Sequence, residues 1–158
     1  MSRVKQLYRA RLAAAVLLPD PAQAEAVERL DTLARALAKS RGWLGGGTPP
    51  KGVYLWGGVG RGKSMLMDLF FEAAPVKERR RVHFHDFMLE THAFIFEWRK
   101  LSAAEKRKHP AYVREAGDDP IAPAAKHIAD VVSLLCFDEF HVNQIADAMI
   151  LGRLFEQL

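Results

Sequence analysis

Apolar residues recur every three or four positions in several parts of the chain, which is the spacing of one face of a helix. The pattern is clearest in Ala22–Lys39, where Val27, Leu30, Leu33 and Leu37 share a face. Asp20 and Pro21 precede this helix as its cap and first-turn residue, and Gly42 is expected to end it. The same spacing predicts helices over residues 65–71, 87–101, 121–130 and 144–158.

Three other segments have the apolar runs or the alternation typical of strands. Residues 52–56 form a short apolar run, and Val82 and Phe84 alternate with polar residues in 81–84. The apolar run over residues 131–137 is expected of a strand that is buried on both faces of a parallel sheet. Because strands alternate with helices, the sequence predicts an α/β fold with a parallel sheet and flanking helices.

Glycine and proline residues over Gly45–Pro50 interrupt the pattern and predict a linker. We therefore expect a helical N-terminal segment with its linker over residues 1–50, followed by an α/β part over residues 51–158. Basic residues near the N-terminus are interleaved with apolar ones, which favours an amphipathic helix ended by Pro19 over a signal or transit peptide. No apolar run reaches the roughly 18–20 residues that span a bilayer.

The most informative chemistry lies in a phosphate-binding loop. The motif comprises Gly57, Gly58, Val59, Gly60, Arg61, Gly62, Lys63 and Ser64, and its spacing matches the P-loop pattern in full. Glycines let the backbone turn tightly and direct N–H groups at an anion. Lys63 is expected to reach the β- and γ-phosphates, and Ser64 to give its hydroxyl to Mg²⁺. An apolar strand before the loop and a helix after it favour ATP with Mg²⁺ as the ligands.

An acidic pair, Asp138 and Glu139, follows the apolar run over residues 131–137. Carboxylates at the carboxyl end of a buried strand stand where ligands bind in such sheets. Asp138 is expected to hold Mg²⁺ through water, and Glu139 to polarise the attacking water as a general base. A GTPase of the usual kind would have Asp-x-x-Gly here, so ATP hydrolysis coupled to movement is preferred.

Weaker signals concern charge, histidine and cysteine. Residues 1–108 hold 20 of the 23 lysines and arginines but 11 of the 19 acids. This basic excess could bind nucleic acid, an acidic partner or an anionic membrane, but we prefer its interpretation as a solvated surface. His83 and His85 would share one face of a strand, where a polar cleft edge is preferred to a metal site. The single cysteine, Cys136, is interpreted as a core residue, and its isolation suits a reducing compartment, so a cytoplasmic location is expected.

Several motifs together resemble the ZapE/Afg-type AAA+ ATPases. The resemblance rests on Lys51–Asp68, Val82–Met88, Leu135–Phe140 with Ile145–Met149, and the early residues Tyr8, Asp20, Gln23 and Leu30. Ser64 stands where that family more often has threonine, and either hydroxyl can bind Mg²⁺. The resemblance implies an ATPase that forms homo-oligomers and, in bacteria, acts on protein partners of the division machinery.

The resemblance also implies that the sheet is incomplete. AAA+ sheets have the strand order 5-1-4-3-2, and this sequence offers only the first three strands. The fourth strand with its sensor residue, the arginine finger and the C-terminal lid are not found before Leu158. We therefore expect an N-terminal fragment in which the P-loop strand lacks a neighbour and which alone binds and hydrolyses ATP poorly.

Two alternatives to an ATPase that acts on proteins remain at this point. A helicase-loader-like ATPase that binds single-stranded nucleic acid would explain the basic first part of the chain, and salt-dependent DNA binding would reveal it. A nucleotide-sensing scaffold with little turnover would explain the absent arginine finger. Replacement of Glu139 by glutamine distinguishes an enzyme from such a scaffold.

Overall fold

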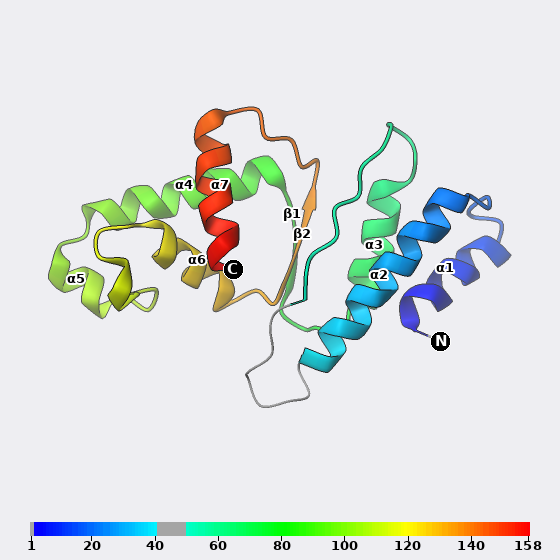
Figure 1. The fold of residues 1–158 in the computed structure, drawn as a ribbon, viewed down its shortest axis with the longest axis horizontal. Helices are drawn as coiled ribbons and strands as arrows, with labels where there is room; N and C mark the ends of the chain where they lie inside the picture. Colours follow the sequence, from blue (N-terminus) through cyan, green and yellow to red (C-terminus); the bar gives the residue numbers. More distant parts are fainter. Residues whose placement is uncertain (1, 41–49) are drawn as a thin grey trace. The chain divides into compact units, whose positions relative to one another are not determined.

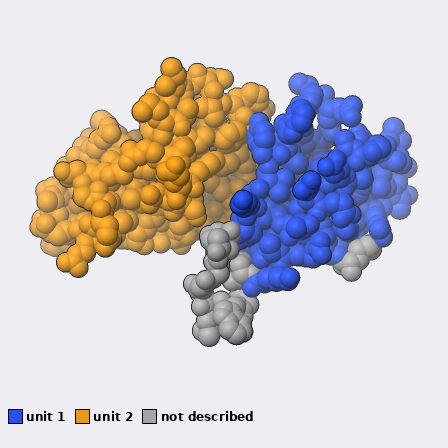
Figure 2. Space-filling view, in the orientation of Figure 1, with its two compact units in different colours: residues 1–77 blue, residues 78–158 orange. Residues whose placement is uncertain are grey.

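The structure is a computed structural model that describes residues 2–40 and 50–158 (Figure 1). The chain divides into two compact units, residues 1–77 and residues 78–158 (Figure 2). The first carries the P-loop motif and the second carries the acidic pair. The domain boundary expected near residue 50 stays a prediction.

Three helices build the first unit: α1 (Arg3–Ala13), α2 (Pro21–Ser40) and α3 (Lys63–Ala73). The helix predicted over residues 22–39 is confirmed as α2, and Asp20 caps it by accepting hydrogen bonds from the backbone N–H groups of Ala22 and Gln23 at 2.8 and 3.3 Å. Its apolar face packs against α1 and α3. The expected helix end at Gly42 and the linker residues 45–49 lie outside the described residues.

The predicted strand over residues 52–56 is wrong. Residues 50–58 have no regular secondary structure, and Tyr54 and Trp56 are 67% and 84% exposed. A strand needs a neighbour to satisfy its backbone N–H and C=O groups. In the described part of the chain, the two strands that form pair only with each other, so this apolar run has no sheet to join.

The second unit contains a two-stranded parallel sheet of β1 (Arg79–His83) and β2 (Leu134–Asp138). The sheet is accompanied by α4 (Phe84–Lys100), α5 (Ala103–Lys108), a 3₁₀ turn η1 (Arg114–Ala116), α6 (Ile121–Ala129) and α7 (Ile145–Gln157). Arg81 is in register with Cys136, and His83 with Asp138. The prediction of a mixed α/β fold with a parallel sheet and flanking helices is confirmed at this level, whereas the AAA+ topology stays a prediction.

Two strand boundaries differ from the expectation. β1 ends at His83 because Phe84 begins α4, where its ring is buried and packs against Phe137 and Phe140 at centroid distances of 5.9 and 4.7 Å. β2 begins only at Leu134, because Val131 and Val132 donate backbone hydrogen bonds back to Ile128 and continue the turn that ends α6. β2 is mostly half-buried, so the expectation that both of its faces are buried is wrong.

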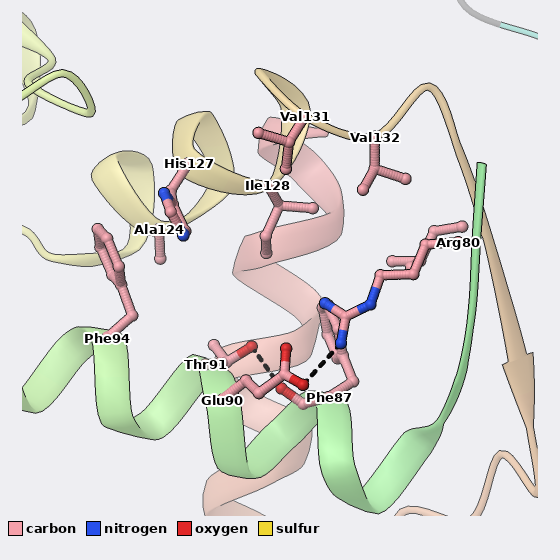
Figure 3. A pocket seen from close by; sticks show the side chains of 11 residues that line it. Arg80, Phe87, Glu90, Thr91, Phe94, Ala124, His127, Ile128, Val131 and Val132 are labelled. Carbon is pink, nitrogen blue, oxygen red and sulfur yellow. Dashed lines mark hydrogen bonds and ion pairs between the residues drawn. The ribbon is translucent and has the colours of Figure 1, made fainter. Parts of the chain in front are cut away.

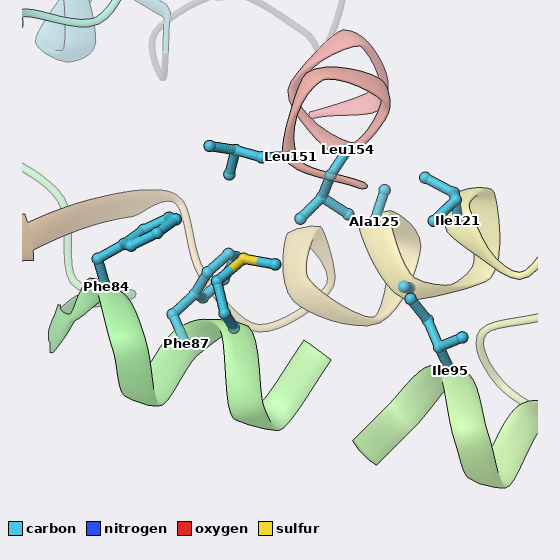
Figure 4. Close-up of a cluster of buried hydrophobic side chains, with 9 residues drawn as sticks. Phe84, Phe87, Ile95, Ile121, Ala125, Leu151 and Leu154 are labelled. Atoms are coloured by element: carbon cyan, nitrogen blue, oxygen red, sulfur yellow. The ribbon is translucent and has the colours of Figure 1, made fainter. Parts of the chain in front are cut away.

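A hydrophobic core fills the second unit between α4, α6 and α7 (Figure 4). It consists of Phe84, Phe87, Met88, Ile95, Ile121, Ala124, Ala125, Leu151 and Leu154. Leu135 and Phe137 of β2 pack against this core, so the strand that leads to the acidic pair is supported on one side. No helix of the described residues is long and apolar enough to cross a membrane.

Candidate functional site

Glycine conformations shape the loop in the first unit. Gly57, Gly60 and Gly62 have φ angles of 145°, 76° and 81°, a region that residues with a side chain rarely adopt. Gly62 is also the N-cap of α3, and its carbonyl accepts the hydrogen bond from Leu66 N–H at 2.9 Å. Helix α3 therefore begins at Lys63, directly after the loop, and its first N–H groups lack partners within the helix. This is the local arrangement that an anion at a helix N-terminus requires.

The side chain of Lys63 reaches back across the loop. Its ammonium group donates hydrogen bonds to the carbonyl oxygens of Gly57 and Gly58 at 2.8 and 2.7 Å. The group is thus held within the loop that the sequence assigns to phosphate. Ser64 follows as the second residue of α3, and the residue is exposed.

The start of α2 holds the far end of the loop, which the sequence did not reveal. The Gln23 side-chain amide donates to the Arg61 carbonyl at 3.3 Å, and Arg61 Nη2 lies 3.5 Å from Asp20 Oδ2. A Cβ atom on Gly62 would lie 3.0 Å from Gln23 Nε2. Only the role of Asp20 as a helix cap had a local signal, since these contacts join residues about 40 positions apart.

The acidic pair lies at the carboxyl end of β2 in the second unit. Asp138 is the last residue of the strand, and its carboxylate pairs with the Arg81 guanidinium from β1. Glu139 is exposed and has a φ of 50°, which is uncommon for a residue with a long side chain. Such backbone strain occurs preferentially at functional sites. The structure therefore places Asp138 and Glu139 in two different environments, one paired and one open to solvent.

Hydroxyl and carboxylate oxygens, as Ser64 and Asp138 supply, are the ligand types that Mg²⁺ prefers. The Ser64 hydroxyl at the start of α3 and the Asp138 carboxylate at the end of β2 are therefore chemically suited to such an ion. Because the two residues belong to different units, only the sequence motifs suggest that they bind one metal ion together.

The histidine pair does not form the expected strand face. His83 ends β1, whereas His85 lies in the first turn of α4, so the strand alternation that would align them is lost. A different histidine, His92, contacts a carboxylate: its Nε2 lies 2.7 Å from Asp147 Oδ1 and joins α4 to α7. Within the described residues, no group of three or more metal-binding side chains comes together.

Cys136 is confirmed as a core residue. It is buried in the middle of β2, and this burial raises the pKa of its thiol to about 11, against a smaller lowering by Arg81 and Arg79. A thiol with such a pKa is almost entirely protonated near neutral pH, so Cys136 is a poor nucleophile.

Two hollows in the second unit lie away from the acidic pair. One has a volume of about 90 Å³, lies between α4 and α6, and is bordered by the Arg80–Glu90 ion pair at 2.6 Å (Figure 3). It is too small for a nucleotide, because ligand pockets usually have volumes of about 300–1,000 Å³. The other, of about 390 Å³, is a groove between α4 and α7 beside the His92–Asp147 contact. Neither is lined by a residue of the P-loop.

Relatives of known name match the chain over most of its length. The cell division protein ZapE of Escherichia coli K12 is 39% identical over 159 aligned residues, which cover 89% of this chain and 38% of that protein. Lactation elevated protein 1 homolog B of Danio rerio is 48% identical over 112 residues, which cover 70% of this chain and 21% of that protein. The chain thus spans well under half the length of both relatives. No solved structure gives a significant match.

A model of one protein family, described as AFG1-like ATPase, matches residues 1–158. The match includes both the loop that opens α3 and the acidic pair that ends β2. It agrees with the resemblance that the motifs carry. The chain belongs to the AFG1-like ATPase family.

Proposed function

We propose that this chain supplies the phosphate-binding loop and the catalytic carboxylates of a Mg²⁺-dependent ATPase. The observation that carries the proposal is the loop over residues 57–62, in which Gly57, Gly60 and Gly62 adopt positive φ angles. The Lys63 ammonium group bonds the Gly57 carbonyl of this loop, and α3 begins directly after it. Family membership supports ATP as the nucleotide.

In this proposal the chain's own groups share the work. The backbone N–H groups of Gly58 to Lys63 surround the phosphates, and the positive end of the α3 dipole favours their negative charge. Lys63 exchanges the carbonyls of Gly57 and Gly58 for the β- and γ-phosphates, because a charge-assisted hydrogen bond to a phosphate is stronger than one to a neutral carbonyl.

The remaining residues of the proposed site would bind the metal ion and activate the attacking water. Ser64 and Asp138 would hold Mg²⁺, Asp138 through water, and the ion would neutralise charge that develops on the transferred phosphoryl group. Glu139 would accept a proton from the attacking water. Its exposed position directly after β2 leaves the carboxylate accessible to such a water.

Replacement of Glu139 by glutamine tests the enzymatic part of the proposal. ATP turnover should fall at least about a hundredfold, because glutamine cannot act as a general base. Affinity for a fluorescent ATP analogue should remain within about twofold, since the loop is untouched. Glu156→Gln is the control, because Glu156 is an exposed glutamate of α7 outside the proposed machinery. Unchanged turnover in Glu139→Gln would favour a nucleotide-sensing scaffold instead.

The choice of partner follows from charge and from the relatives. Several basic groups of the first 108 residues form ion pairs within the chain: Lys5 with Glu28, Arg61 with Asp20, Arg80 with Glu90 and Arg81 with Asp138. Such pairing leaves less positive charge for nucleic acid.

The Escherichia coli relative is named a cell division protein, so we propose protein partners of the division machinery. In a bacterial host, cells that carry only the Glu139→Gln variant should divide late and elongate, and normal cell length would contradict this role.

Homo-oligomer formation and a cytoplasmic location complete the proposal. The first comes from the resemblance of the motifs to AAA+ ATPases, and the second from the single cysteine, Cys136, which is free and suits a reducing compartment. Sedimentation of the purified protein with and without ATP tests the first. A mass that stays that of one chain at saturating ATP would contradict it.

A further inference from the structure

Arg81 forms an ion pair with the carboxylate of Asp138, which the proposed function assigns to Mg²⁺. In β1, Arg81 is in register with Cys136, and Asp138 is two residues further along β2, on the same face of the sheet. The side chain of Arg81 therefore needs only to extend along its face to reach Asp138. Its guanidinium does so with two groups, Nε and Nη2, which both donate to Asp138 Oδ2.

The environment strengthens this pair. The Nε···Oδ2 distance is 3.1 Å, and the Asp138 side chain is only 14% exposed, whereas that of Arg81 is 37% exposed. A guanidinium remains charged at every pH at which proteins function. A charge-assisted contact that uses two donors is among the stronger hydrogen bonds of proteins. Any cation that approaches Asp138 therefore meets a carboxylate that already has a partner.

The neighbouring residue, Arg80, does not take part in the ion pair between Arg81 and Asp138. Arg80 lies on the opposite face of β1 and pairs with Glu90 of α4 at 2.6 Å (Figure 3). The two arginines share a strand and a charge but pair with different carboxylates. Arg80 therefore provides a matched comparison for any variant of Arg81.

We propose that Arg81 is a resident counter-ion of Asp138 and competes with the divalent metal for this carboxylate. The consequence, which rests on the proposed function, is that metal binding at Asp138 depends on the nucleotide. Mg²⁺ in such sites usually has one or two carboxylate ligands together with phosphates. Without phosphates the ion would have to displace Arg81 for a single carboxylate, and with them it gains further ligands. Arg81 is thus a positioning residue that delays the metal until ATP is bound.

Binding of Mn²⁺ alone, followed by electron paramagnetic resonance, tests the competition without any ATP turnover. Arg81→Gln should bind Mn²⁺ roughly three- to tenfold more tightly than the natural protein in the absence of nucleotide, because a partly exposed charge pair of this kind has been removed. The gain should disappear in Arg81→Gln combined with Asp138→Asn. Arg80→Gln should bind Mn²⁺ like the natural protein. Equal affinity in Arg81→Gln and Arg80→Gln, or weaker binding in Arg81→Gln, would overturn the proposal.

A second measurement on the natural protein serves if Arg81→Gln does not fold. The side-chain Nε–H resonance of Arg81 should shift when Mg²⁺ and a non-hydrolysable ATP analogue are added together, and much less with Mg²⁺ alone. If the resonance shifted with neither addition, the proposal that the metal replaces Arg81 as the partner of Asp138 would be refuted. Because neither readout depends on hydrolysis, an increase in Mn²⁺ affinity in a protein without ATPase activity would leave this inference standing and remove the proposed function.

Discussion

The P-loop of the first unit and the acidic pair of the second are built in different ways. The loop depends mainly on neighbours in sequence: three positive φ angles, a helix start and the bonds of Lys63 to Gly57 and Gly58. Gln23 and Asp20 add distant contacts to Arg61 of the loop. The acidic pair ends a strand that is paired along β1 and supported by the aromatic core. The carboxylate of Asp138 pairs with Arg81, which is 57 positions away in the chain.

This difference teaches which features a motif can encode. A phosphate loop consists of backbone geometry and a lysine within eight consecutive residues, so the sequence of those residues specifies it. A carboxylate at a strand end acquires its properties from long-range contacts. We therefore expect changes in the loop to affect nucleotide binding first, and changes in the core to affect the stability of the unit that holds the acids.

The largest effect is expected for Lys63→Ala. Removal of the ammonium group should lower ATP affinity or turnover about a hundredfold, because it deletes the charge that faces the phosphates. Titration with a fluorescent ATP analogue and a turnover assay measure it. Lys51→Ala, which removes an exposed lysine before the loop, is the control and should leave both values unchanged. Equal affinity and turnover in the two variants would show that this loop is not the nucleotide site.

Leu154→Ala tests the other side of the comparison. Leu154 is fully buried in the core of the second unit, so its truncation should lower the free energy of unfolding by about 2–5 kcal/mol. Urea denaturation measures the loss, and hydrogen exchange should locate it in α4, α6 and α7. Ile145→Ala removes an exposed side chain of the same helix and should cost little. A loss below about 1 kcal/mol for Leu154→Ala would mean that no well-packed core supports the acidic pair.

The sequence predicted the helices well because their signal is local. The apolar faces of α2, α6 and α7 recur within each segment, and the structure has these helices within a few residues of the expected bounds. The cap of α2 at Asp20 was also predicted, since capping requires only adjacent residues.

The strands and the pairings of the candidate site were harder to predict. Residues 52–56 have a strand-like run but no partner, and alternation in residues 81–84 did not reveal that Phe84 enters α4 and the core. Contacts of Arg81 with Asp138 and of Gln23 with the loop join distant residues, for which one sequence has no signal.

Gly62→Ala should have a moderate effect that is confined to the loop. The φ of 81° would strain alanine, and the new Cβ would lie 3.0 Å from Gln23 Nε2. We expect a loss of about 1–2 kcal/mol in stability, measured by urea denaturation, together with weaker ATP binding. Gly152→Ala in α7 is the matched control, because its Cβ meets nothing within 4 Å and helix propensity favours alanine by about 1 kcal/mol. Equal effects of the two substitutions would contradict the strained loop.

Glu90→Gln should have the smallest effect and shows whether charges or packing support the second unit. The hydrogen bond from Arg80 holds the pKa of Glu90 below its usual value of 4.5. A lowered pKa means that the pair stabilises the fold above the unfolded pKa, and that this contribution is lost as the pH falls through the folded value. Because both side chains are well exposed, the natural protein should exceed Glu90→Gln by less than about 1 kcal/mol at pH 7, with the difference shrinking in acid. Unfolding free energies at several pH values, with Glu156→Gln as the control, measure it. A difference as large as that of Leu154→Ala would mean that ion pairs, and not the core, hold the strand that carries the acidic pair.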